Sequence, residues 1–134
     1  MRVMLDTNIL ISVIFFPSMQ TRKFVMEVVK HNLILCDYVL NELRLVVERK
    51  FPLKKSVLEE FFADLKFELV ITSTDTNYDG IPSVRDQKDT PILAAAIKNG
   101  VDVFVTGDKD FLVLNVLSPE IMSMTEFLFK YGMV

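Results

Sequence analysis

The chain has few of the residues on which thiol and imidazole chemistry depends. Its 134 residues include one cysteine, Cys36, and one histidine, His31. A single cysteine cannot form an intramolecular disulfide, and a metal site built on thiolates needs several. With one histidine and no nucleophile elbow, a serine or cysteine catalytic triad is not expected. We therefore expect Cys36 to be a small core residue, and His31 to be a charge partner at the end of a helix.

Targeting signals and long apolar runs are also missing. The N-terminus lacks a basic start followed by an apolar run and a small-residue cleavage site, and no apolar run approaches the length that crosses a bilayer. We expect a cytoplasmic protein without membrane association. With 51% hydrophobic and 25% charged residues, and no repeat or low-complexity segment, residues 1–134 fit a single globular domain with an apolar core.

The apolar residues follow two periodicities in turn. Short runs rich in apolar and β-branched residues predict five strands, at 2–6, 32–36, 67–72, 102–106 and 120–124. Longer segments with apolar residues every three or four positions predict helices, at 21–31, 38–50, 55–65 and 89–100. Strands separated by helices pair in parallel through right-handed crossovers. The sequence therefore predicts an α/β fold, a three-layer α/β/α sandwich with a central parallel five-stranded sheet.

The helix predicted at 89–100 has signals at both ends. Asp89 or Thr90 fits the N-cap, and Pro91 fits the first turn. Gly100 fits the position that stops a helix. This segment therefore has the clearest predicted boundaries in the chain.

Acidic residues gather at the ends of the predicted strands. In such a sheet, ligands bind outside the carboxyl ends of the strands. Asp6 ends the first strand, with Asn8 two residues further on, and Asp108 follows the fourth strand. Glu42 lies one turn inside the helix after the second strand, and Asp89 begins the helix before the fourth. Four carboxylates from distant parts of the chain can therefore converge on one edge of the sheet.

Converging carboxylates need a positive partner. Like charges repel at close range, and burying them unpaired costs more than the net stability of a small domain. The candidate ligands offer only oxygen, which favours Mg²⁺ or Mn²⁺ over Zn²⁺. One or two such ions can orient a water, lower its pKa and stabilise charge during displacement at a phosphodiester. The predicted metal ligands are Asp6, Glu42, Asp89 and Asp108, with Asn8 orienting Asp6 or the water.

Three stretches together resemble the PIN-domain family of metal-dependent ribonucleases, particularly its stand-alone prokaryotic VapBC-type toxins: MLDTNIL, CDYVLNEL and DQKDTPILAAAIKNGVDVFVTGDKDF. The likeness covers essentially the whole chain in the family's order. It assigns the family's four acids to Asp6 with its partner Asn8, to Glu42, to Asp89 and to Asp108. Asp86 and Asp110 are close enough in the sequence to share the third and fourth of these roles.

The resemblance implies several properties that composition and spacing do not. These are the strand order 3-2-1-4-5, homodimerisation and RNA cleavage that leaves a 5′-phosphate. It also implies a small antitoxin, which would place a basic side chain among the carboxylates. Eleven phenylalanines and seven methionines are a further hint of a self-association surface.

The charge balance is unusual for a protein that acts on RNA. Fifteen basic and 18 acidic residues give a formal net charge of −3 and a pI of about 5.1, whereas nucleic-acid-binding proteins usually have a basic footprint. Two divalent ions would add four positive charges to −3 and give +1. Basic residues cluster at 43–55, and Arg22, Lys23, Lys88 and Lys109 flank the motifs. The cluster fits an RNA path and an ordinary solvated helix face equally well.

Other functions share parts of this pattern. A phosphorelay receiver domain also has acids at strand ends, but it needs paired acids after the first strand and a lysine after the fifth. A haloacid-dehalogenase-like phosphatase needs a second aspartate where Asn8 stands. A non-catalytic PIN-fold binding module would keep the fold alone. Taken singly, each acid also fits a helix cap or a solvated position, Asn8 could cap a helix in residues 10–16, and Asp102, at the amino end of its strand, has no predicted role.

Overall fold

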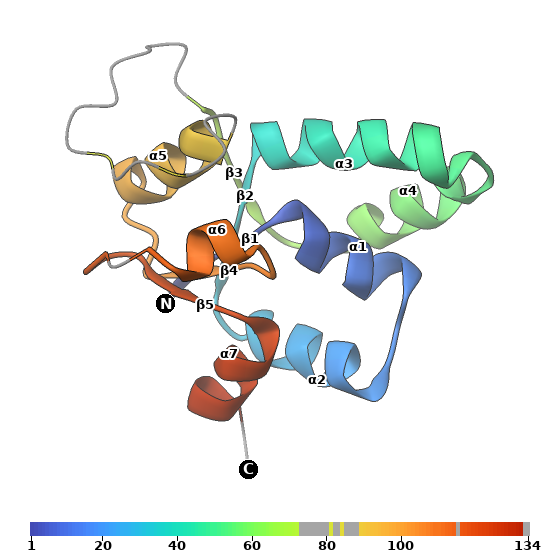
Figure 1. Ribbon diagram of the computed structural model, residues 1–134. Coiled ribbons are helices and arrows are strands. Elements are labelled where there is room, and N and C mark those ends of the chain that lie inside the picture. The colour runs from blue at the N-terminus through green and yellow to red at the C-terminus, as the bar shows by residue number, and fades with distance from the viewer. Residues whose placement is uncertain (73–80, 82–83, 85–88, 115, 133–134) are drawn as a thin grey trace.

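Five parallel strands form the framework of the fold. The computed structural model describes residues 1–72, 81, 84, 89–114 and 116–132. The strands are β1 (Arg2–Leu5), β2 (Asn32–Cys36), β3 (Glu68–Val70), β4 (Val103–Val105) and β5 (Glu120–Met122). The helices of the described part are α1 (Thr7–Phe15), α2 (Met19–Val28), α3 (Asp37–Lys50), the 3-10 turn η1 (Pro52–Lys54), α4 (Lys55–Ala63), α5 (Thr90–Lys98), α6 (Lys109–Leu112) and α7 (Met124–Tyr131) (Figure 1).

The strand order in the sheet is β3-β2-β1-β4-β5, and every neighbouring pair is parallel. Val3 of β1 pairs with Leu33 of β2 on one side and with Val103 of β4 on the other. This order confirms the predicted parallel α/β fold and the order that the family resemblance implied. It also differs from the order 2-1-3-4-5 of receiver domains, so that alternative is excluded.

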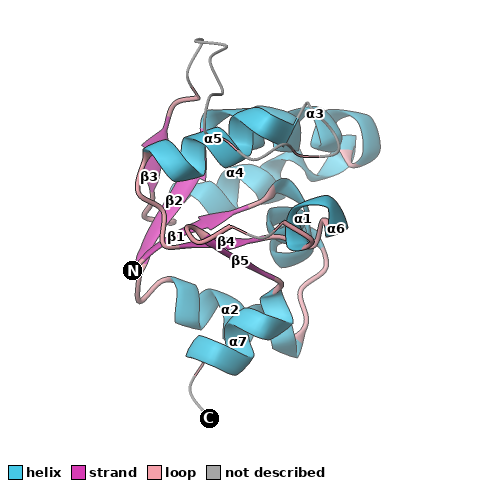
Figure 2. Ribbon diagram, turned by 60° about the vertical axis from the view of Figure 1, so that its left-hand side comes forward, coloured by secondary structure: helices cyan, strands magenta, loops and turns pink. Residues whose placement is uncertain are grey.

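The centre of the sheet is apolar on both faces. All residues of β4 are buried, as are Val3, Met4 and Leu5 of β1. Parallel strands covered on both sides carry continuous apolar runs instead of an alternating pattern, as the sequence of these strands shows. Helices α2 and α7 lie on one side of the sheet and α5 on the other (Figure 2).

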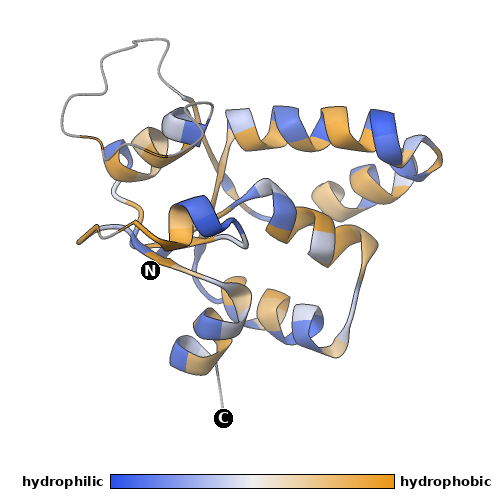
Figure 3. Cartoon of the chain, in the orientation of Figure 1, coloured by the Kyte–Doolittle hydropathy of each residue, from blue (hydrophilic) through white to orange (hydrophobic). Residues whose placement is uncertain are grey.

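Aromatic rings fill the space between the sheet and its helices. Phe24 of α2 meets Phe127 of α7 with ring centroids 5.4 Å apart, and Phe104 of β4 meets Phe111 of α6 at 5.1 Å. All four side chains are fully buried. The helices otherwise carry both apolar and polar residues (Figure 3), which is typical of helices with one face on a core.

Helix α5 ends as predicted. Gly100 follows the last turn with φ +63°, and its N–H donates to the Ile97 carbonyl at 3.3 Å. The next N–H, of Val101, reaches back to the Ala96 carbonyl at 3.0 Å. A left-handed residue followed by such a pair of bonds is the usual helix stop, and glycine adopts it without steric cost.

Some boundaries differ from the prediction. The strand predicted to reach residue 124 ends at Met122, and α7 then begins behind a reciprocal cap between Ser123 and Glu126. Helix α2 ends at Val28, three residues before His31. Burial and the nearby N-terminal ammonium group lower the pKa of His31. The predicted helix end at residue 31 is therefore wrong, and the role of His31 as a charge partner stays a prediction.

Two expectations about single elements can be compared with the structure. Cys36 is fully buried at the end of β2, and burial raises the pKa of its thiol to about 11. The prediction that Cys36 is a core residue is confirmed. Within the described residues, no single helix is long and apolar enough to cross a membrane, and α1 with α2 meets that criterion only as a pair bent by 120°.

Replacing Gly100 by alanine isolates the cost of the left-handed conformation. An added Cβ meets no atom within 4 Å at Gly100 or at Gly107, but only Gly100 has a positive φ. We expect Gly100→Ala to lower the free energy of unfolding by about 1 kcal/mol and Gly107→Ala to leave it nearly unchanged. Urea denaturation followed by circular dichroism measures both. Equal effects for the two variants would contradict this explanation of the helix stop.

Candidate active site

Asp6 is buried at the carboxyl end of β1. Its side chain is held from two directions, and only 5% of the residue is exposed. Oδ1 accepts a hydrogen bond from the backbone N–H of Thr7 at 2.8 Å, so Asp6 is the N-cap of α1. Oδ2 accepts a hydrogen bond from the hydroxyl of Thr106 at 2.7 Å. The carboxylate is therefore fixed between the ends of two neighbouring strands.

Thr106 connects Asp6 to the loop that carries Asp108. Its hydroxyl donates to Asp6 and accepts from the backbone N–H of Asp108 at 3.0 Å. Thr106 is completely buried, and its own N–H donates to the Met122 carbonyl of β5 at 3.0 Å. Sequence reasoning missed this residue. The available signal was a hydroxyl directly after an apolar strand, because a buried hydroxyl needs hydrogen-bond partners.

Glu42 and Asp108 act on Asp6 through their charge. Burial is the main cause that raises the pKa of Asp6, and the carboxylates of Glu42 and Asp108 raise it further. The hydrogen bonds from Thr106 and Thr7 act in the opposite direction, since they stabilise the charged form. The structure thus brings together three of the four predicted acids, from β1, α3 and the loop after β4.

Asp108 has a second function as a helix cap. Its Oδ1 accepts from the backbone N–H of Asp110 at 2.9 Å, which starts α6. Both Asp108 and Asp110 are partly exposed, in the first residues after β4. Capping uses one lone pair of Oδ1 and leaves Oδ2 unused by the cap, so the capping role and a ligand role are compatible at Asp108.

Asp89 lies at the start of α5, and the opposite end of this helix lies at the amino edge of the sheet. Arg2 Nε, at the start of β1, donates to the Asn99 carbonyl at 3.1 Å, which places the end of α5 at the amino edge. The nine residues of α5 span about 13 Å, and the helix starts next to the beginning of α3 (Figure 1). Asp89 therefore lies toward the predicted carboxyl edge. It occupies the N-cap position, but its side chain makes no capping hydrogen bond.

The other predicted site residues have different outcomes. Asn8 is exposed on the first turn of α1, and Asp6, not Asn8, caps that helix. Thr7 and Thr106 hold the Asp6 carboxylate, so the predicted contact from Asn8 to Asp6 is replaced by these two. The role of Asn8 in orienting a water stays a prediction. Asp86 and Lys88 lie outside the described residues.

The donor chemistry of the cluster fits a hard divalent cation. Within the parts of the chain that the structure describes, no three acidic, histidine or cysteine side chains are positioned to hold one ion together. Mg²⁺, however, usually keeps several waters and binds one or two protein carboxylates. Asp6 with Glu42 or Asp108 meets that need with oxygen donors alone. Among the described residues, none of the groups that shift the pKa of Asp6 is cationic, so an ion bound there would offset the negative charge of this carboxylate.

Asp102 provides an internal comparison. It is an exposed acid at the amino end of β4, and its carboxylate accepts from the backbone N–H of Arg2 at 2.7 Å. That contact joins the starts of β1 and β4, opposite the acid cluster. The prediction that Asp102 lies at the amino edge is confirmed.

Comparisons with known proteins agree with the fold. A family model described as PIN domain matches residues 2–110, a range that contains all the predicted acids. Seven chains of solved structures match. One is VapBC2 from Rickettsia felis bound to a DNA fragment from their promoter, with 21% identity, 91% of this chain and 97% of that chain covered, and a TM-score of 0.68. None of the curated proteins matches.

The buried charge of Asp6 predicts a specific pH dependence. An acid whose pKa is raised by folding binds its proton more tightly in the folded state, so its contribution to stability is lost as pH rises above the unfolded pKa near 3.8. Asp6→Asn has no proton to lose. In metal-free buffer, we expect the variant to gain stability relative to wild type as pH rises from about 4 toward neutral. Urea denaturation across this range measures it, and a constant difference would contradict it.

The buried hydroxyls of Thr106 and Thr7 can be compared, because only the hydroxyl of Thr106 is hydrogen-bonded. Thr106→Val leaves the Asp6 carboxylate and the Asp108 N–H without their partner, and we expect it to cost about 1–3 kcal/mol of unfolding free energy. The buried Thr7 hydroxyl is the only side-chain oxygen in the described part that is buried without a hydrogen bond, so we expect Thr7→Val to be neutral or stabilising. Thermal and urea denaturation compare the two. A stable Thr106→Val variant would show that the hydrogen bonds of Thr106 do not stabilise the fold.

Proposed function

The chain belongs to the PIN-domain family, and from this membership we propose that it is an Mg²⁺- or Mn²⁺-dependent endoribonuclease that hydrolyses RNA phosphodiester bonds. PIN domains are generally nucleases, and the family generally uses divalent metal ions. The observation that carries the proposal is the environment of Asp6. Its carboxylate is buried, burial together with Glu42 and Asp108 raises its pKa, and no cationic side chain of the described residues is among the groups that shift this pKa.

In this proposal the acidic side chains bind the metal ion, and Thr106 positions two of the acidic residues. Asp6 would bind an ion together with Glu42 or with Asp108, which allows one or two ions, and Asp89 is the fourth predicted ligand. A bound ion supplies an activated water and offsets the charge that develops on the scissile phosphate. Thr106 fixes the rotamer of Asp6 and, through the N–H of Asp108, the start of α6. Ligands held on strand ends need little reorganisation when an ion or a phosphate arrives.

We also propose that the protein is the toxin of a toxin-antitoxin pair and acts in the cytoplasm as a homodimer. The structural likeness to VapBC2, a complex solved on a DNA fragment from its promoter, supports the proposal of a toxin-antitoxin pair. Exposed apolar side chains support an interface, among them Phe129 at 90%, Val113 at 77% and Met19 at 76% exposure. A small antitoxin would insert a basic side chain among Asp6, Glu42 and Asp108. An antitoxin that left cleavage unchanged would contradict that mode of inhibition.

Cleavage of a structured RNA tests the activity. We expect the wild-type chain to cut it with Mn²⁺ or Mg²⁺, to release 5′-phosphate ends and to stop in EDTA. Asp6→Asn, Glu42→Gln and Asp108→Asn should each slow cleavage about 10²-fold or more. Asp102→Asn is the matched control, because it removes an acid at the opposite edge and should keep full activity. Activity that survives EDTA or Asp6→Asn would contradict the proposal.

Metal binding can be measured without RNA. We expect calorimetry to show Mn²⁺ binding to wild type that is lost in Asp6→Asn, and Mn²⁺ at a hundred times its Kd to stabilise wild type by about 2.7 kcal/mol. Asp102→Asn should bind and respond as wild type does. If no metal binds, or if Asp6→Asn binds equally well, the acids act as caps and surface charges. The fold would then act as a non-catalytic binding module.

A further inference from the structure

Helices α3 and α4, joined by η1, form an arm that extends beyond the carboxyl edge of the sheet (Figure 1). We call residues 37–63 the arm. Glu42 lies near its base, where its charge reaches Asp6. The 14 residues of α3 span about 21 Å. The outer end of the arm is therefore well separated from the acid cluster, although the same helix carries both.

The outer end of the arm is basic. Residues 49–55 contain four cationic side chains and no acid, in a chain whose net charge is −3. We call these four residues the tip cluster: Arg49, Lys50, Lys54 and Lys55. All four are exposed, and none forms an ion pair with a side chain in the described part. Repulsion among unpaired like charges is relieved by an anionic partner.

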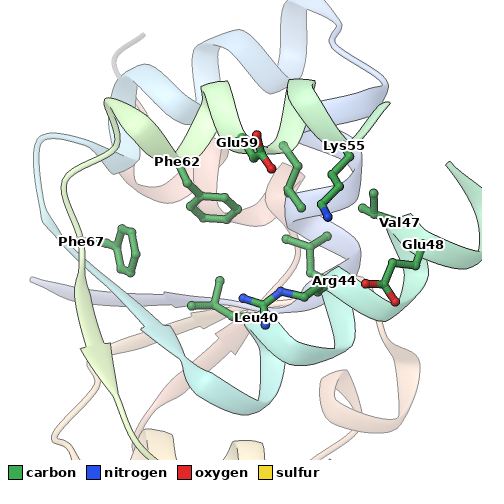
Figure 4. A pocket seen from close by; sticks show the side chains of 10 residues that line it. Leu40, Arg44, Val47, Glu48, Lys55, Glu59, Phe62 and Phe67 are labelled. Atoms are coloured by element: carbon green, nitrogen blue, oxygen red, sulfur yellow. The ribbon is translucent and has the colours of Figure 1, made fainter. Parts of the chain in front are cut away.

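A cavity of about 300 Å³ lies beside the tip cluster, between α3 and α4 (Figure 4). We call it the arm pocket. Its lining comprises Leu40, Leu43, Arg44, Val47, Glu48, Lys55, Leu58, Glu59, Phe62 and Phe67. In Figure 4, Phe62, Phe67 and the nitrogen ends of Arg44 and Lys55 are directed toward the space between the helices. The charges of Glu48 and Glu59 balance those of Arg44 and Lys55 in the lining. Attraction for a polyanion therefore comes from the other three cations of the tip cluster.

We propose that single-stranded RNA binds along the arm, with backbone phosphates on the tip cluster and one base in the arm pocket. This proposal rests on the proposed function and names the surface that receives the substrate. Cations that track a backbone next to aromatic rings are the usual features of single-strand binding, because every base has a face that can stack. Phe62 is half-buried, and its ring lies 5.9 Å from that of Phe67. An apolar peptide segment would fill the same arm pocket, but it would leave the four cations of the tip cluster without an anionic partner.

The tip cluster is tested by the salt dependence of binding. We would measure the anisotropy of a labelled single-stranded RNA with the full chain in EDTA, so that no cleavage occurs. Each phosphate contact of a single strand contributes about 0.7 to the slope of log K against log salt. Lys50→Gln with Lys54→Gln should reduce the slope by about 1.4 and weaken binding about ten-fold. In cleavage assays with Mn²⁺, KM should rise and kcat should stay unchanged.

A matched double variant controls for the loss of charge. Lys66→Gln with Lys98→Gln also removes two exposed lysines, but Lys66 lies two residues before β3 and Lys98 ends α5, both toward the amino edge of the sheet. We expect this variant to keep the wild-type slope and KM. An equal loss in both double variants would show that only net charge matters, and it would overturn the assignment to the arm.

The arm pocket is tested by keeping or removing the ring of Phe62. Phe62→Tyr retains the aromatic face, whereas Phe62→Leu retains only an apolar side chain. We expect Phe62→Leu to weaken RNA binding about ten-fold without changing the salt slope, and Phe62→Tyr to bind as wild type does. Circular dichroism and urea denaturation check that both variants are folded.

The outcomes separate this proposal from the proposed function. If wild type cleaves RNA and all arm variants bind and cleave as wild type does, the arm is not the RNA surface, and its pocket is left to a protein partner. If wild type does not cleave with any divalent ion, the nuclease proposal fails by itself. RNA binding in EDTA would still report whether the arm holds a single strand.

Discussion

The hydrogen bond between Thr106 and Asp6 is the contact on which the carboxyl edge of the sheet depends. A buried carboxylate is costly unless its oxygens are bonded, and here one oxygen is held by Thr106 and the other by the start of α1. The same hydroxyl holds the N–H of Asp108. One buried side chain therefore positions both the residue that caps α1 and the residue that caps α6, and these two residues are two of the acids.

The framework could be predicted because its signals are local. Apolar runs such as VMLD and VFVT mark the strands, and Pro91 and Gly100 mark the ends of α5. The strand order came from the family resemblance, since spacing alone does not order parallel strands. Helix α7 was missed although Ser123 and Glu126 form a capping pair. The apolar run at 120–124 continues into that helix, and a short apolar run fits a strand and a helix start equally well.

The site was harder to predict because its contacts are distant in the sequence. The acids could be placed on one edge from their positions after strands, and Asp6, Glu42 and Asp108 do come together. The partner of Asp6 could not be found in this way. Thr106 lies 100 positions away, whereas Asn8, the neighbour that reasoning favoured, is exposed. The register of β1 against β4 determines which side chain contacts the Asp6 carboxylate. This register cannot be predicted from the sequence of either strand alone.

The burial of Cys36 has a practical consequence for physical studies of this protein. The only thiol of the chain is inaccessible, and its pKa of about 11 keeps it protonated at neutral pH. Alkylating reagents react with the exposed thiolate, so the folded wild-type chain is effectively inert toward them. A cysteine introduced at a surface position would then be the single labelling site. Fluorescent and paramagnetic probes can be attached there without first removing a native residue from the core.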